Sequence, residues 1–150
     1  MSEGSNSLRI PDVNVLIHSV NQRSPRHEEA QSWLRGALSE PNVLGLPWMS
    51  LAGFLRLSTD PRVLADALSP ANSLSVVDDW LSNRNARQIA PGSQHLSILG
   101  RLMIEHSVTG RDITDARFAA IAIEHNAIFA TFDSDFHRFA ELDLEYLGAR

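Results

Sequence analysis

The sequence contains no cysteine and no lysine, and each absence excludes a kind of chemistry. Without cysteine there is no disulfide framework and no thiolate metal site, which agrees with a cytoplasmic protein. Without lysine there is no P-loop phosphate site and no Schiff-base chemistry, because both need the amine. No apolar run approaches the roughly 20 residues that cross a bilayer, and the polar start MSEGSNS is unlike a secretory signal. We therefore expect a cytoplasmic protein without a membrane partner.

Length and composition indicate one globular domain. A chain of 150 residues with 43% hydrophobic and 21% charged residues can bury a single sizeable core. We expect this domain to span residues 8–150, after a polar tail over residues 1–7 that we expect to be disordered.

The charge of the chain bears on its partners. A formal net charge of −5 argues at first sight against a nucleic-acid partner. Most of that excess comes from four aspartates, without which acidic and basic residues are nearly balanced: Asp12, Asp115, Asp133 and Asp135. All 13 basic residues are arginine, whose planar guanidinium suits bidentate phosphate contact. This bias permits RNA or DNA binding, and it is equally compatible with the codon usage of a GC-rich genome.

Short apolar segments alternate with amphipathic ones along the chain, which predicts an α/β fold around a mainly parallel sheet of four or five strands. The predicted strands cover residues 8–12, 43–46, 87–90, 127–131 and 142–147. The predicted helices cover residues 14–20, 27–38, 47–57, 64–68, 72–81, 94–106 and 113–125. Within these helices we expect three tryptophans and a leucine-rich set to face the core: Trp33, Trp48, Trp80, Leu74, Val77, Leu81, Leu96, Leu99, Leu102 and Met103.

Carboxylates recur where predicted strands end and one helix begins. Asp12 follows the first strand, and Asp133 and Asp135 follow the strand over 127–131. Asp115 lies in the first turn of an almost wholly apolar helix that Asp112 can cap and that Asn126 ends. In open α/β sheets, ligands bind at the carboxyl ends of the strands. We therefore expect the four aspartates to converge at one edge of the sheet.

Such a cluster needs compensation. Two carboxylates ~5 Å apart repel by roughly 3 kcal/mol at an effective dielectric constant of 20. A divalent cation, an arginine or protonation would relieve the repulsion. Hard oxygen ligands favour Mg²⁺ or Mn²⁺ over zinc, and a cation held by carboxylates suits phosphodiester hydrolysis. Taken singly, however, each aspartate also fits an ordinary role as a turn residue or helix cap.

Four segments carry a family resemblance: IPDVNVLIH (10–18), GFLRLSTDPRV (53–63), APGSQHL (90–96) and TDARFAAIAIEHNAIFATFDSDF (114–136). In this order they resemble the PIN-domain ribonucleases, specifically the VapC toxins of bacterial VapBC toxin-antitoxin pairs. The resemblance implies a PIN-like three-layer fold and a Mg²⁺- or Mn²⁺-dependent endoribonuclease. It also implies a homodimer, an RNA substrate and a cognate VapB-like antitoxin as partner.

The resemblance also assigns roles to particular residues. Asp12, Asp115 and Asp133 match the family's metal-binding acids, and Asp135 matches the acid that completes the catalytic cluster. Asn14 matches the asparagine that supports the first aspartate. Two further suggestions come from position alone. Thr131 shares a strand face with Asp133 and could position water or a phosphate oxygen. Two arginines flank the acidic helix start and could hold RNA: Arg111 and Arg117.

Gly53 departs from the pattern, because many PIN domains have a glutamate at this position. Fewer direct ligands predict weak metal binding, with one ion at most in the absence of RNA. Two alternatives stay open. One is a catalytically silent PIN-like binding module. The other is a different Mg²⁺-dependent phosphohydrolase, although a haloacid-dehalogenase-type phosphatase would need an aspartate where Asn14 stands and normally a lysine.

Overall fold

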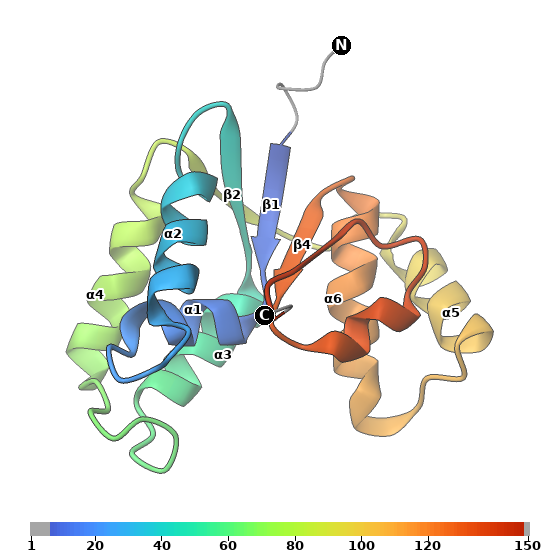
Figure 1. Cartoon of the computed structure of the whole chain (residues 1–150). Helices are drawn as coiled ribbons and strands as arrows, with labels where there is room; N and C mark the ends of the chain where they lie inside the picture. Colours follow the sequence, from blue (N-terminus) through green and yellow to red (C-terminus); the bar gives the residue numbers. More distant parts are fainter. Residues whose placement is uncertain (1–6, 149–150) are drawn as a thin grey trace.

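A computed structural model describes residues 7–148 as a three-layer α/β fold (Figure 1). Five strands, all parallel, form one sheet in the order β3-β2-β1-β4-β5. They are β1 (Ser7–Pro11), β2 (Asn42–Pro47), β3 (Ala86–Ile89), β4 (Ile128–Thr131) and β5 (Leu144–Tyr146). The α/β fold class and the parallel sheet are confirmed. The expected disordered tail lies outside the described residues except for Ser7, which begins β1.

Helices cover both faces of the sheet. Figure 1 shows α2 and α4 on one side and α6 with α5 on the other. The helices are α1 (Val13–Val20), α2 (His27–Ala37), α3 (Trp48–Ser58), α4 (Pro70–Leu81), α5 (His95–Glu105) and α6 (Ile113–Glu124). Two short 3₁₀ helices complete the fold, η2 (Gly110–Asp112) and η3 (Ser134–Arg138). No helix in the described part of the chain is both long enough and apolar enough to cross a membrane.

Two hydrophobic clusters fill the layers. The first joins α1 to α4 to one face of the sheet around Leu16, Phe54 and Trp80. The second joins α5, α6 and η3 to the other face around Phe118, Phe129 and Phe136. Helix α6 is apolar on nearly all sides because it lies between the sheet and α5, as the sequence predicted. Asn126, at φ 55°, supplies the left-handed residue that ends it.

The central strand β1 ends at a proline, and that end sets up the site. Pro11 lies opposite Ala130 of β4, where a proline can stand because it is the last residue of its strand. The Ser50 hydroxyl donates to the Pro11 carbonyl at 2.9 Å, and the Asp12 N–H donates to the Ala130 carbonyl at 2.8 Å. The chain is therefore fixed on both sides where Asp12 begins the turn into α1.

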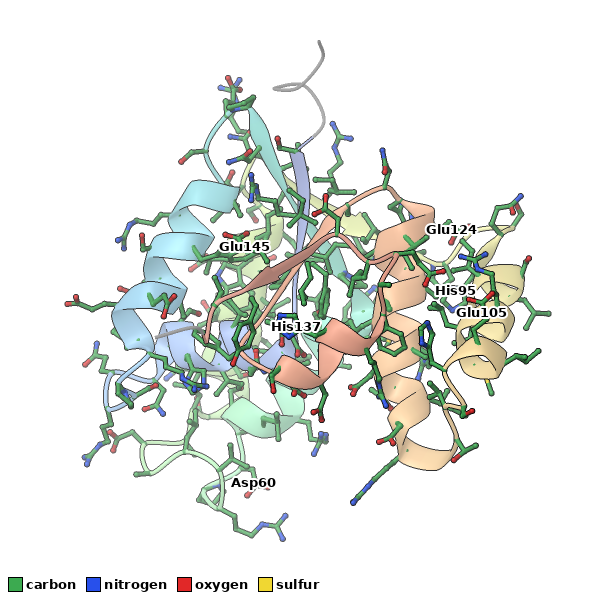
Figure 2. All side chains as sticks on the ribbon, turned by 45° about the vertical axis from the view of Figure 1, so that its right-hand side comes forward. Asp60, His95, Glu105, Glu124, His137 and Glu145 are labelled. Atoms are coloured by element: carbon green, nitrogen blue, oxygen red, sulfur yellow. The ribbon has the colours of Figure 1, made fainter. Side chains whose placement is uncertain are left out.

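The connection between α3 and α4 corrects one prediction. We expected a helix over residues 64–68, but this segment forms turns. Asp60, in the loop below α3 (Figure 2), accepts backbone hydrogen bonds from Val63 and Leu64 through its carbonyl. Its side chain also bonds the Arg62 N–H at 2.9 Å. These bonds favour a turn over a helix at a point where Leu64 alone is buried.

Three predicted core positions are wrong. Leu74 of α4 is 57% exposed and Leu96 of α5 is 79% exposed. In α4 the buried stripe starts instead at Ser73, whose hydroxyl bonds that of Ser58 inside the core at 2.6 Å. A polar residue with a buried partner thus displaced the expected leucine. Trp48 is 51% exposed, because the first residue of α3 lies beyond the layer that buries Trp33 and Trp80.

Candidate functional site

Asp12 lies where the two central strands end. It caps α1, and its Oδ1 accepts the N–H of Val13 at 2.7 Å. Its Oδ2 accepts the hydroxyl of Thr131 at 2.7 Å and the amide of Asn14 at 3.4 Å. Three donors from β4 and α1 therefore hold one partly buried carboxylate in a defined orientation.

Thr131 connects this carboxylate to the next one. It is fully buried at the end of β4, and its oxygen also accepts the N–H of Asp133 at 2.9 Å. Asn14 contributes a second link, since its side-chain oxygen accepts the N–H of Phe132 at 3.3 Å. The predicted supporting residues thus lie between Asp12 and Asp133. Their part in a reaction remains a prediction.

Asp133, Asp135 and Asp115 complete the acidic edge. Asp133 caps η3 by accepting the N–H of Asp135 at 2.9 Å, and Asp135 itself is exposed. Asp115 lies in the first turn of α6, as expected. Asp112 does not cap this helix with its side chain, contrary to the prediction, because the preceding turn η2 places it in a helical conformation.

The pKa values show that the carboxylates sense one another. Burial raises the pKa of Asp12 from 3.8 to about 6, although the hydrogen bonds from Thr131 and Val13 oppose it. The charges of Asp115 and Asp133 raise this pKa further. Burial and the charge of Asp133 also raise the pKa of Asp115. Folding therefore concentrates negative charge at a cost that a cation bound at this edge would offset.

An arginine that the sequence reading missed provides part of that compensation. Arg138, at the end of η3, donates from Nη2 to Asp115 Oδ2 at 3.3 Å and counteracts the rise in the pKa of Asp115. The one available signal was its place three residues after Asp135, within a turn of the acidic pair. Both side chains are partly exposed, at 33% and 26%, so solvent weakens the ion pair. The guanidinium of Arg138 also lies over the ring of Phe139, 5.0 Å from its centroid.

Within residues 7–148, no three of the aspartates at the sheet edge have carboxylate oxygens that all lie within 4.8 Å of one another. Among residues 7–148, the acidic and histidine side chains whose ligand atoms all lie within 4.8 Å of one another form a different group, Glu105, His106 and Glu141. Figure 2 shows Glu105 on the α5 side of the molecule. There Arg101 already neutralises Glu141 at 3.0 Å. At the sheet edge, the aspartate side chains must therefore rotate toward a shared cation before they can chelate it.

Comparison with known proteins identifies the family. The PIN domain model matches residues 9–142. Ribonuclease VapC37 of Mycobacterium tuberculosis is 36% identical over 132 residues, covering 88% of this chain and 92% of the relative. Ribonuclease VapC43 of the same species is 34% identical over 131 residues, covering 87% and 89%. This chain belongs to the PIN-domain family. Within that family it groups with the VapC ribonucleases.

Solved structures agree on the fold. VapBC2 from Rickettsia felis, bound to a DNA fragment from its promoter, matches with a TM-score of 0.70 at 19% identity, over 93% of this chain and 98% of that one. VapBC-1 from nontypeable Haemophilus influenzae matches with a TM-score of 0.64 at 16% identity, over 93% and 97%. At such identities the likeness concerns the fold alone.

Gly53 has a structural reason in this VapC-family chain. It lies in α3 against α1, and a Cβ built on it would approach Val13 Cγ2 to 2.7 Å. A side chain at this position would therefore require Val13 or one of the two helices to shift. The isopropyl group of Val13, the residue that follows Asp12, occupies the space beside Gly53.

The two predicted RNA-binding arginines have different positions. Arg111 is exposed in η2, and Arg117 is exposed on α6, where it lines a cavity of about 600 Å³ beside the acidic edge. Two histidines have structural partners. His18 bonds the Ser24 hydroxyl at 2.7 Å, and His106 packs against Phe139.

Proposed function

We propose that this VapC-family protein is a metal-dependent endoribonuclease, the toxin of a type II toxin-antitoxin pair, which hydrolyses RNA phosphodiester bonds. The observation that carries the proposal is the site around Asp12, a partly buried carboxylate whose pKa is raised by burial and whose orientation is held by the hydroxyl of Thr131. The matched relatives are named ribonucleases, which supports the same reaction. We further propose that the protein acts in the cytoplasm as a homodimer and is held inactive by a VapB-like antitoxin.

We propose Asp12, Asp115 and Asp133 as the residues that would hold Mg²⁺ or Mn²⁺. The donor set fits, because it consists of hard carboxylate oxygens without thiolate or paired imidazole ligands. The electrostatics fit as well, because burial and, to a smaller extent, the neighbouring carboxylates raise the pKa values of Asp12 and Asp115, and a bound cation would favour their charged forms. When bound, such a cation would make water a better nucleophile and offset charge on the phosphoryl oxygens.

Other residues of the site would position the metal ligands, the attacking water and the RNA. Thr131 and Asn14 restrict Asp12 to one orientation, and a fixed first carboxylate lowers the cost of assembling the others. Asp135 lies two residues after Asp133, in the first turn of η3, and would orient water at the exposed side of the site. Arg138, released from Asp115, and the exposed Arg111 and Arg117 would contact phosphates of the RNA.

A catalytically silent binding module is the second candidate. It is favoured by the ion pair between Arg138 and Asp115, which already neutralises one proposed ligand. Thermal unfolding during a Mn²⁺ titration separates the two candidates. A protein that binds the ion gains stability in proportion to RT ln(1 + [L]/Kd), whereas a module without a metal site shows no specific gain.

The reaction is tested with purified protein and RNA. We expect cleavage of a cellular RNA mixture in Mg²⁺ or Mn²⁺, no cleavage in chelator, and loss of cleavage in Asp12→Asn and Asp133→Asn. The matched control is Asp79→Asn, which changes an exposed aspartate of α4. Cleavage that survives both site substitutions would overturn the proposal, because it would have to come from another site or a contaminant.

A further inference from the structure

A cavity of about 600 Å³ opens beside the acidic edge, between α3, the end of β3 and α6. It begins at the site itself, because Val13 and Thr114, which line it, directly follow Asp12 and precede Asp115 in the chain. Its inner wall is apolar and includes Ile89, Phe118 and Ile121. Gly53 also lines the cavity, at the point where the side chain of Val13 packs against it.

Trp48, the first residue of α3, lines the same cavity and is half exposed. Its exposed fraction is 51%, against 8% for Trp33 and 8% for Trp80. No aromatic contact within the described residues involves its ring. An exposed indole beside an apolar wall offers a planar surface for stacking.

The rim of the cavity is positively charged. Arg56 and Arg117 both line it, both are exposed, and neither forms a hydrogen bond or ion pair with another described residue. The charge of Arg56 reaches Asp60, but the pKa of that carboxylate is lowered mainly by its hydrogen bond with Arg62. No lining residue is acidic. The cavity therefore suits a ligand with a flat, apolar part that contacts the inner wall and an anionic part that contacts the arginines at the rim.

We infer that this cavity is a nucleobase subsite for single-stranded RNA, in which a base stacks on Trp48 while Arg56 and Arg117 contact the flanking phosphates. The inference rests on the proposed ribonuclease function and specifies its substrate as unpaired RNA. Unpaired bases can turn outward to stack on aromatic side chains, whereas the bases of a duplex are covered by their neighbours. A volume within the usual range of ligand pockets accommodates a base with its ribose.

A protein occupant, such as a second copy of this chain, fits the observations less well. The cavity presents two exposed guanidinium groups and no acidic residue among its described lining, and Val13 and Thr114 of that lining adjoin the proposed metal ligands Asp12 and Asp115 in the chain. A polyanion running from the acidic edge into the cavity would satisfy both groups at once, with its scissile phosphate near the aspartates.

The test measures RNA binding in chelator, so that the RNA stays intact and binding does not depend on cleavage. A short single-stranded oligoribonucleotide is titrated against wild type, Trp48→Ala and Trp48→Phe. The same titrations use oligonucleotides with one abasic ribose, placed at each position in turn. The control is Leu74→Ala, an exposed apolar residue of α4 outside the cavity.

We expect saturating RNA to quench the tryptophan fluorescence of the wild type. Trp48→Ala should weaken binding of the intact RNA by roughly 5- to 100-fold, Trp48→Phe by much less, and Leu74→Ala not at all. The decisive result is coupling: for one abasic position, Trp48→Ala should cause no further loss, because the base that stacks on the indole is already missing.

Two results would overturn the inference. One is unchanged affinity of Trp48→Ala for the intact RNA. The other is an equal loss for the intact RNA and for every abasic RNA, as expected if Trp48 mediates contact between copies, in which case sedimentation would also show a change of mass. The cleavage assay is scored separately. If Trp48→Ala and one abasic position are coupled in binding but no RNA is cleaved, the proposed reaction is wrong and the subsite stands. If RNA is cleaved in a metal-dependent way but no abasic position is coupled to Trp48, the subsite is wrong and the proposed reaction stands.

Discussion

Replacing Asp12 with asparagine should stabilise the metal-free protein. The pKa of this carboxyl is raised from 3.8 to about 6, mainly by burial, so the folded state disfavours its charged form. At 1.36 kcal/mol for each pKa unit, the shift corresponds to a cost of about 3 kcal/mol at neutral pH. Asparagine is uncharged and keeps one oxygen that can accept the Val13 N–H, so the cap of α1 can persist.

The direction of the pH dependence follows from the raised pKa. Well below pH 3.8 the carboxyl of Asp12 is protonated in both the folded and the unfolded chain, and no cost arises. As the pH rises from about 4 to about 6, the unfolded chain loses its proton first, and the free energy of unfolding falls by about 3 kcal/mol. Asp12→Asn avoids this loss. After allowance for its altered hydrogen bond with Thr131, we expect the variant to be more stable than wild type by about 1–3 kcal/mol at pH 7.

The assay is urea unfolding in chelator at several pH values between 4 and 7. The difference between Asp12→Asn and wild type should be small at pH 4 and grow to its full size by pH 7. Asp79→Asn, at an exposed position, should show no such growth. A variant that is less stable than wild type at pH 7, or a difference independent of pH, would refute the view that Asp12 is held charged at a cost. Added Mn²⁺ should reverse the order by stabilising wild type alone.

Three further substitutions test the surroundings of the site. Thr131→Val should cost about 1–3 kcal/mol in unfolding free energy and lower Mn²⁺ affinity by about 10- to 100-fold, with Thr131→Ser as the control that restores the hydroxyl. Arg138→Gln removes a cation that competes for Asp115, so Mn²⁺ affinity measured calorimetrically should rise by roughly two- to tenfold; a fall would show that Arg138 supports the metal site. Gly53→Ala should lose about 1 kcal/mol in thermal unfolding because its Cβ crowds Val13, whereas Gly100→Ala, with open space around it, should gain about 0.5–1 kcal/mol.

The sequence predicted the elements whose patterns are dense and local. The run from Ala116 to Ala122 could only be a buried helix, and the strands before Asp12 and Asp133 were short, apolar and bounded by turn residues. From parallel strands it followed that their carboxyl ends meet, so the position of the aspartates at one edge could be anticipated. The family resemblance added roles that the pattern alone left open.

The errors arose where a tertiary partner decides the outcome. A leucine such as Leu96 fits a helical stripe, but which stripe faces inward depends on the neighbouring elements. The buried hydroxyl pair of Ser58 and Ser73 joins α3 to α4 across 15 positions of the chain, which the spacing of apolar residues does not predict. Arg138 reaches Asp115 across 23 positions of the chain, and no local rule links them. The exposure of Trp48 likewise appears only once α3 is placed beside β3.

The same limit applies to the separation of the carboxylates. Sequence spacing could place the aspartates at one edge, but not the distances between their oxygens, which depend on side-chain rotations and on the charge of Arg138. We propose that these acids nevertheless share one divalent cation.

A Mn²⁺ titration of the free protein, followed by electron paramagnetic resonance, tests that claim most directly. We expect one ion per chain in wild type and none at the same concentration in Asp115→Asn or Asp133→Asn. Two tightly bound ions in wild type, no bound ion, or full binding in both variants would contradict it.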